Sequence, residues 1–370
     1  MTAAFFVYFS IVLVCVLFSK SAIYLKNKLI KFIVSYLIPV SYAAIFLGGR
    51  FKTGSDWENY KEYYDEILKY GMSFSEVFSS SLEPAYLFLN KFVAFFDLGS
   101  SYFFAIVTIV HLTAVYFIFR KSPKLLPYGL FFYLMGNMSL DVNVVRQSIA
   151  FSCVALSSVY VTEKRYVAFL LFMLAICFHY SALFVAPILF LDKSLFRFID
   201  NPILVVVLYA LTIVLATPIN DVFSGYLQLI EFGTKYAGNA ENLSEMMDVS
   251  SGYGLLSKHF VNFALIYLWC KIRIIVSNQY YVLIYRTCVL GFLWANIFGI
   301  SVFLSRLTLY YTFFTFVMWT FIAYSIFNNV NLKKYRLFVI CVILLDLLLF
   351  AAGILHSSGG CSPYTFRWIG

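Results

Sequence analysis

The chain has 370 residues, of which 62% are hydrophobic, 21% aromatic and only 12% charged. Soluble domains carry about 25% charged residues, so this composition excludes an ordinary soluble enzyme. The net charge of +9 does not indicate nucleic-acid binding, because the basic residues are scattered between apolar runs. The seven cysteines follow no metal or redox spacing. We therefore expect a membrane protein with no metal and no cofactor.

Apolar runs recur from the first residues to the last, most of them close to the ~20 residues that a helix needs to cross a bilayer. They lack the alternation of transmembrane β-strands. We predict an all-α polytopic membrane protein, a single bundle of about 11–13 transmembrane helices that forms one domain over residues 1–370. The predicted spans are 3–18, 32–47, 101–119, 125–140, 143–161, 166–191, 203–217, 255–271, 280–300, 307–326 and 337–353.

Two apolar segments do not fit simple alternation across the membrane. Residues 84–96 are short, and we expect a half-helix that dips in from the outer face, which is allowed where protein covers its backbone. Residues 166–191 are broken by Phe178-His179-Tyr180. Read as one span, this segment leaves the acidic loop 218–254 inside; read as a hairpin with His179 at its outer tip, it leaves that loop outside. We favour the hairpin.

Basic clusters mark the cytoplasmic side of a membrane protein. In this chain they lie at 20–31, 120–124, 164–165, 271–273 and 333–336. They place two larger segments, 48–83 and 218–254, outside the membrane. In the first, aromatic and aliphatic residues from Trp57 to Leu68 recur every three or four positions, which predicts an amphipathic helix. This helix fits an aromatic belt at the membrane interface or a platform for sugar stacking.

Several arginines stand at the outer ends of spans, where topology does not favour them, or in the outer tail: Arg50, Arg146, Arg306 and Arg367. Ionisable groups near membrane depth are costly, so a partner or a task usually holds them. One interpretation is structural pairing, such as Arg146 with Asp141 or Glu83. The other is an anion site, because guanidinium groups bind phosphate oxygens bidentately. Converging arginines would fit a lipid-linked diphosphate.

His179 is a single histidine among apolar residues, and such a residue is more often packed in the core than catalytic. It stands, however, at the predicted break of the hairpin. Histidine can also exchange a proton near neutral pH. Both interpretations stay open.

Five short motifs follow one another through most of the chain. They are Arg50-x3-Gly54-Ser55-Asp56-x3-Tyr60; Glu83-Pro84; Val145-Arg146-Gln147; Phe178-His179-Tyr180-Ser181-Ala182; and Arg306-x3-Tyr310, with Pro363-Tyr364 near the end. In these motifs and their order the chain resembles the EpsG/Wzy-type polysaccharide polymerase family.

The resemblance implies an enzyme that joins lipid-linked oligosaccharide repeats into O-antigen, capsule or exopolysaccharide at the outer face of the bacterial inner membrane. It implies undecaprenyl diphosphate as the carrier, and a flippase and a chain-length regulator as partners. His179 or Asp56 would act as the base, and Arg50, Arg146 and Arg306 would bind the diphosphate. The supporting residues would be Glu83, Gln147, Tyr310, Tyr60 and Arg367.

A transporter of lipid-linked oligosaccharides is the alternative from another functional class. Such a protein is expected to show internal repeats and charges that line a path through both leaflets. The sequence has no such repeat, and Asp346 is the only carboxylate deep in a predicted span. These features favour the polymerase.

Overall fold

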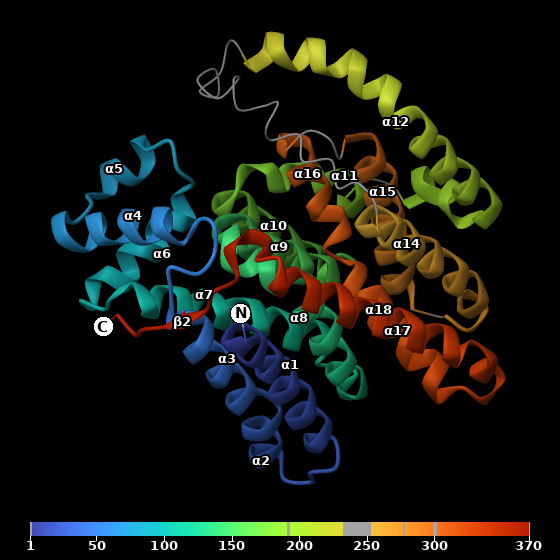
Figure 1. Ribbon diagram of the computed structural model, residues 1–370, viewed down its shortest axis with the longest axis horizontal. Helices are drawn as coiled ribbons and strands as arrows, with labels where there is room; N and C mark the ends of the chain where they lie inside the picture. The colour runs from blue at the N-terminus through green and yellow to red at the C-terminus, as the bar shows by residue number, and fades with distance from the viewer. Residues whose placement is uncertain (1, 191–192, 232–252, 277, 299–301, 370) are drawn as a thin grey trace. The chain divides into compact units, whose positions relative to one another are not determined.

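The computed structural model describes residues 2–190, 193–231, 253–276, 278–298 and 302–369 (Figure 1). These residues form helices almost throughout, and their only sheet has two short strands. Among the described residues, six helices are long and apolar enough to cross a membrane: α1 (Thr2–Ala22), Lys28–Gly48, α7 (Ser100–Phe119), α15 (Gln279–Phe298), Ser305–Asn328 and Val330–Leu355. The all-α polytopic class is therefore confirmed.

The number of crossings stays a prediction. A seventh span results if Ser194–Asp200 and Pro202–Ala216, which meet at an angle of 87°, count as one. Three further predicted spans are also helical: α8 (Leu126–Asn143), α9 (Val145–Tyr160) and α14 (Tyr253–Ile272).

The chain divides into two compact units, and the first comprises residues 1–183 and 319–370. In this unit α7 packs against α8, α9 and α3 (Ile38–Gly48), while α9 packs against α10 (Arg165–Phe178). Helix α18 (Arg336–Leu355) contacts α1 and α8. The largest buried side chains include Phe103, Phe104, Tyr133 and Phe151.

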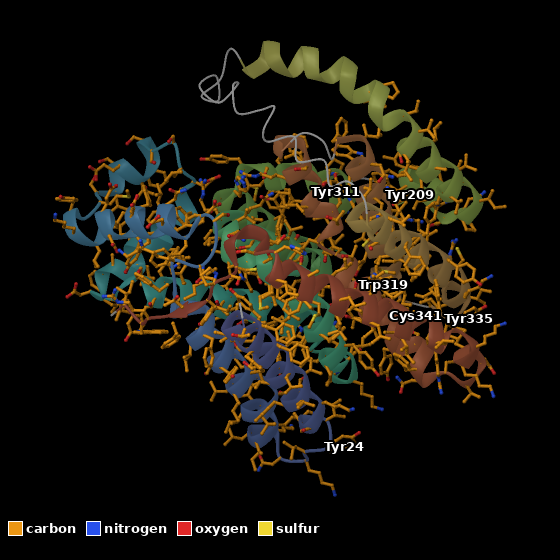
Figure 2. The ribbon with its side chains drawn as sticks, viewed as in Figure 1. Tyr24, Tyr209, Tyr311, Trp319, Tyr335 and Cys341 are labelled. Carbon is orange, nitrogen blue, oxygen red and sulfur yellow. The ribbon has the colours of Figure 1, made fainter. Side chains whose placement is uncertain are left out.

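The second unit comprises residues 184–318. It contains α11 (Ala186–Phe190), η4 (Lys193–Asp200), α12 (Pro202–Glu231), α14, η6 (Arg273–Ile275), α15 and α16 (Val302–Thr312). The buried Arg286 on α15 donates to Asp200 at the end of η4, with Nε 3.0 Å from Oδ1. On α12, the hydroxyl of Tyr209 (Figure 2) lies 2.8 Å from His259 Nδ1 on α14.

The apolar part of α12, Pro202–Ala216, agrees with the predicted span 203–217. The helix itself continues beyond that span, through Pro218 to Glu231. Most of the predicted outer loop 218–254 lies outside the described residues.

The predicted outer segment 48–83 starts with the strand β1 (Arg50–Phe51) and contains two helices, α4 (Trp57–Tyr70) and α5 (Phe74–Ser79). Helix α4 buries Trp57, Tyr64 and Ile67, which confirms the predicted amphipathic helix. Residues 84–96 form the short helix α6 (Pro84–Phe95), with Pro84 at its first turn. The predicted dip of α6 into the membrane stays a prediction.

The chain breaks at His179, as predicted. Helix α10 ends at Phe178, and His179 is extended, with φ −160° and ψ 117°. The second arm is not a regular helix: a six-residue 3-10 turn, Tyr180–Val185, precedes the five-residue α11. The crossings of the predicted hairpin stay a prediction.

The C-terminal tail binds the start of the outer segment, a contact that the sequence did not predict. Strand β2 (Thr365–Phe366) pairs antiparallel with β1. The amide of Gly54 donates to Gly360 O at 2.8 Å. Gly360 has a φ of +67°, and a Cβ there would stand 2.9 Å from Ser55 N, so only glycine fits.

The packing of α3 on α7 depends on Gly48. A Cβ at Gly48 would lie 2.8 Å from Ala105 Cβ and 2.9 Å from Ser101 O. We expect Gly48→Ala to lower the free energy of unfolding by about 1–3 kcal/mol, because it overpacks this contact. Gly136→Ala on α8 is the matched control, since no atom lies within 4 Å of a Cβ there. Thermal unfolding in detergent measures both, and equal stability would contradict the packing argument.

Candidate active site

The buried carboxylate of Glu83 brings together three of the motifs found in the sequence. Its Oε2 accepts a hydrogen bond from Arg146 Nη1 at 2.6 Å, and its Oε1 lies 2.6 Å from His179 Nδ1. The side chain of Glu83 is 5% exposed, whereas those of Arg146 and His179 are 30% and 25% exposed. The anion is therefore enclosed, and its two partners stay within reach from outside the protein.

Each member of this Glu83–Arg146–His179 cluster lies at the end of a helix. Glu83 precedes Pro84, which favours the extended backbone observed (ψ 136°), and it caps α6, where the helix dipole favours an anion. Arg146 stands in the first turn of α9, after a break at Val144. His179 caps α10, which packs against both α6 and α9.

Glu83 is held in its ionised form. Burial alone would raise its pKa, but the hydrogen bond to His179 and the charge of Arg146 outweigh burial and hold the pKa below its ordinary value. An ionised carboxylate only accepts hydrogen bonds, so Nδ1 of His179 carries the proton of this contact. In neutral His179, Nε2 is then the nitrogen with a free lone pair.

Tyrosines from α4 and α6 surround the cluster. The Arg146 guanidinium lies 5.7 Å from the centroid of the buried Tyr86 ring. The rings of Tyr60 and Tyr63 lie 6.1 Å and 6.0 Å from that of Tyr86. Burial raises the pKa of Tyr60, opposed by the charge of Arg146, so its phenol is neutral at physiological pH. The aromatic helix α4 thus supplies one wall of the site.

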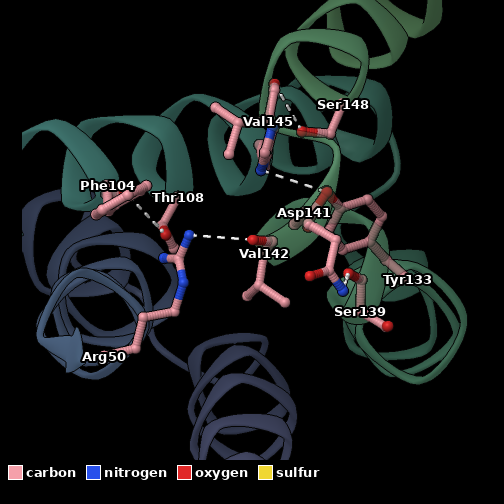
Figure 3. Close-up of polar contacts among 11 residues, drawn as sticks. Arg50, Phe104, Thr108, Tyr133, Ser139, Asp141, Val142, Val145 and Ser148 are labelled. Atoms are coloured by element: carbon pink, nitrogen blue, oxygen red, sulfur yellow. Dashed lines mark hydrogen bonds and ion pairs between the residues drawn. The ribbon is translucent and has the colours of Figure 1, made fainter. Parts of the chain in front are cut away.

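Arg50 does not belong to this cluster, and the structure does not support its predicted role in diphosphate binding. Its side chain is buried, with the residue 3% exposed. The guanidinium donates to Leu47 O at the end of α3 and, at 3.3 Å, to Val142 O, and it lies 4.2 Å from the centroid of the Phe104 ring (Figure 3). Arg50 therefore satisfies the carbonyls of helix ends instead of an external anion.

Asp141, one of the two proposed partners of Arg146, lies in a separate buried group. Its Oδ2 accepts from the Tyr133 hydroxyl at 2.6 Å (Figure 3), and its Oδ1 lies 3.3 Å from His111 Nδ1. Of the two proposed partners, Glu83 is the one that pairs with Arg146.

Of the other predicted site residues, Asp56, Gln147 and Arg367 belong to the first unit, and Arg306 and Tyr310 belong to the second. Asp56 begins α4 and accepts from the Ser55 hydroxyl at 3.4 Å. Arg367 is exposed, 5.1 Å from the Phe51 ring centroid. Gln147 is buried next to Arg146 in sequence. On α16, Arg306 is exposed and Tyr310 is buried; their convergence with Arg146 stays a prediction.

From the sequence, we expected Glu83 to have only a supporting role, and we did not single out Tyr86. The available signal was the Glu-Pro pair, because a carboxylate that begins a helix in an apolar chain needs a partner. Within the described ranges, no three His, Cys, Asp or Glu side chains gather where they could hold a metal ion. The arrangement can hold an anion beside Arg146 and accept a proton at His179 Nε2.

A sequence model of the EpsG family matches residues 34–366 and so covers every residue of the cluster. The chain belongs to the EpsG family. Comparison with curated proteins and with solved structures gives no match. Membership of the EpsG family supports, in broad terms, a polysaccharide polymerase function of the glycosyltransferase kind in a multi-pass membrane protein.

Proposed function

We propose that this EpsG-family protein transfers a growing glycan from undecaprenyl diphosphate onto a lipid-linked oligosaccharide repeat. The reaction would take place at the outer face of the bacterial inner membrane and would yield O-antigen, capsule or exopolysaccharide. The observation that carries this proposal is the enclosed Glu83 carboxylate, held between the partly exposed Arg146 and His179. A flippase would supply the repeats, and a chain-length regulator would limit the product.

In the proposed reaction, a hydroxyl of the acceptor sugar forms a bond to the anomeric carbon of the donor glycan. The bond from that carbon to the diphosphate oxygen breaks, and the diphosphate takes the electron pair. His179 Nε2 takes the proton of the hydroxyl. Arg146 stabilises the charge that develops on the leaving group with the donors that do not contact Glu83.

Glu83 would act on this reaction through its two neighbours. It fixes the tautomer and the ring orientation of His179, and it stabilises the imidazolium that forms when the proton arrives. It also orients the guanidinium of Arg146. Tyr60 and Tyr63 offer ring faces on which sugars can stack. Arg306 and Tyr310 would complete the diphosphate site, and Asp56 is the alternative base.

The proposal is tested with the purified full-length protein and a synthetic undecaprenyl-diphosphate repeat. New glycosidic bonds, detected as a ladder of products, are expected from the wild type. Arg146→Ala is expected to abolish the ladder, and Arg146→Lys to restore part of it, because lysine keeps the charge but loses the planar fork. Arg165→Ala, at an exposed arginine of α10, is the control. Movement of the repeat across vesicles without bond formation would identify a transporter instead.

The orientation of the site is tested separately by cysteine labelling in spheroplasts, with the native Cys341 replaced by alanine. Ser81→Cys lies in the exposed loop before Glu83 and is expected to react with an impermeant maleimide. Ser122→Cys, exposed in a predicted cytoplasmic loop, is expected to react only after lysis. The reverse pattern would place the cluster on the cytoplasmic side.

A further inference from the structure

A cavity of about 270 Å³ lies at one end of three neighbouring helices of the first unit. Its lining comes from the end of α1, the start of the Lys28–Gly48 span and the end of α7. All three helices are long and apolar enough to cross a membrane. The cavity therefore lies where the hydrocarbon core gives way to lipid headgroups. It belongs to the end of the helices that the basic clusters place in the cytoplasm, and none of its lining residues belongs to the Glu83 cluster.

Three cations from the basic clusters at 20–31 and 120–124 line this cavity: Lys28 and Lys31 at the start of the Lys28–Gly48 span, and Arg120 at the end of α7. Among the described residues, none of the three forms an ion pair with an acid, and Arg120 instead lies 5.2 Å from the centroid of the Tyr160 ring. The adjacent Lys121 differs, because it pairs with Glu163 at 2.5 Å. The cavity thus gathers positive charge that the protein itself leaves uncompensated.

The lining of the cavity is mostly apolar, but it carries a few buried hydroxyl groups, one of them on an irregular helix. Ser19 and Ser35 are buried there, and the Ser35 hydroxyl lies 3.2 Å from that of Tyr116. Ser35 belongs to η1 (Ile33–Leu37), a π-helical turn within the Lys28–Gly48 span. Such π-turns are rare and are found frequently at functional sites. The Ser19 hydroxyl donates to Val16 O. The donors that the cavity offers to a phosphate group are therefore the three cations and the Ser35–Tyr116 hydroxyl pair.

Topology alone does not account for this arrangement. The positive-inside rule requires basic residues in cytoplasmic loops, but it does not require cations of separate loops to line one cavity. Lys20, Lys26 and Lys124 belong to the same two basic clusters and are exposed, but they do not line the cavity. They provide an internal comparison with the same charge.

We propose that this cavity binds the headgroup of an anionic glycerophospholipid. Its volume is close to the lower end of the range for small-ligand sites, ~300–1,000 Å³, so it fits a headgroup and not a whole lipid. The acyl chains would follow the exposed apolar side chains beside the cavity, Leu29, Ile30 and Phe32. Basic pockets between transmembrane helices are suited to such lipids. The bound lipid would tie α1, the Lys28–Gly48 span and α7 together.

Native mass spectrometry of the full-length protein, titrated with dioleoyl phosphatidylglycerol, tests the proposal. We expect the triple variant Lys28→Gln, Lys31→Gln, Arg120→Gln to bind this lipid roughly 100-fold more weakly, about fivefold for each cation. The control triple Lys20→Gln, Lys26→Gln, Lys124→Gln removes the same charge and is expected to change binding less than about threefold. Phosphatidylcholine, which has no net charge, is expected to bind neither protein specifically.

Three results would overturn the proposal. Equal losses in both triples would show that binding follows net charge alone. Equal affinity for phosphatidylcholine would remove the role of the cations. Competition by inorganic phosphate as strong as that by the lipid would identify an anion site without a lipid. Size-exclusion profiles of both triples check that the variants fold, and Ser35→Ala, which leaves every charge in place, is expected to weaken binding by a smaller factor.

Discussion

Replacement of His179 by glutamine is expected to lower polymer formation by about 10²–10⁴-fold, the effect typical of losing a general base. The glutamine amide keeps much of the size of the ring and can still donate to Glu83, but it cannot take up a proton at neutral pH. Binding of the lipid-linked repeat is therefore expected to persist. Single-turnover assays with saturating repeat measure the loss in the chemical step.

Asp56→Asn is the companion variant, because Asp56 is the competing base. Its effect is expected to be mild, since Asp56 contacts Ser55 and is not part of the Glu83 cluster. The opposite ranking of the two variants would transfer the role of base to Asp56. Near-normal turnover in His179→Gln would return His179 to a packing role.

Glu83→Gln is expected to lower polymer formation by up to as much as His179→Gln does, and to destabilise the fold. Both partners of Glu83 donate hydrogen bonds, whereas an amide offers one acceptor oxygen and one donor nitrogen, so one of the two contacts becomes a clash of donors. Breaking a fully buried pair costs about 3–5 kcal/mol. Because Arg146 and His179 are about a third and a quarter exposed, we expect a loss nearer ~1–3 kcal/mol here.

Thermal unfolding in detergent measures this loss, with Glu62→Gln on the exposed side of α4 as the control. The pH dependence gives a second readout. The pKa of Glu83 is depressed in the folded protein, so its stabilising contribution is present above the unfolded value of about 4.3 and disappears as pH falls through the folded pKa. The difference in stability between wild type and Glu83→Gln should therefore not decrease from pH 7 to about pH 5, and protonation of His179 beside Glu83 can only increase it. A difference already lost at pH 6 would contradict an ionised, paired Glu83.

The effects of Glu83→Gln and His179→Gln on polymer formation are also expected to be non-additive. If Glu83 works through His179, the double variant should be hardly less active than His179→Gln alone, since groups that act together are not additive. If the activity losses of the two single variants multiply in the double variant, Glu83 also acts independently of His179, through its contact with Arg146.

Local composition and periodicity were enough to predict several features of the fold. Long apolar runs can only form helices in a bilayer, because every backbone group must be satisfied within the segment. The aromatic spacing from Trp57 onward determined the amphipathic face of α4, and Phe178-His179-Tyr180 marked the break after α10. These features depend on neighbours along the chain, so one sequence suffices to predict them.

Which charged side chains pair with one another depends on how the helices pack, and local sequence patterns do not predict it. Arg146 and His179 lie 63 and 96 positions along the chain from Glu83, whose carboxylate joins them. Arg50 and Arg146 have similar positions in the sequence, each at the predicted outer end of a span. Arg50 nevertheless donates to backbone carbonyls, whereas Arg146 pairs with Glu83. The pairing of β2 with β1 likewise joins the C-terminal tail to Arg50 and Phe51, far away in sequence. The partner of a buried charge is the group that helix packing places beside it. The neighbouring residues in the sequence therefore do not predict that partner.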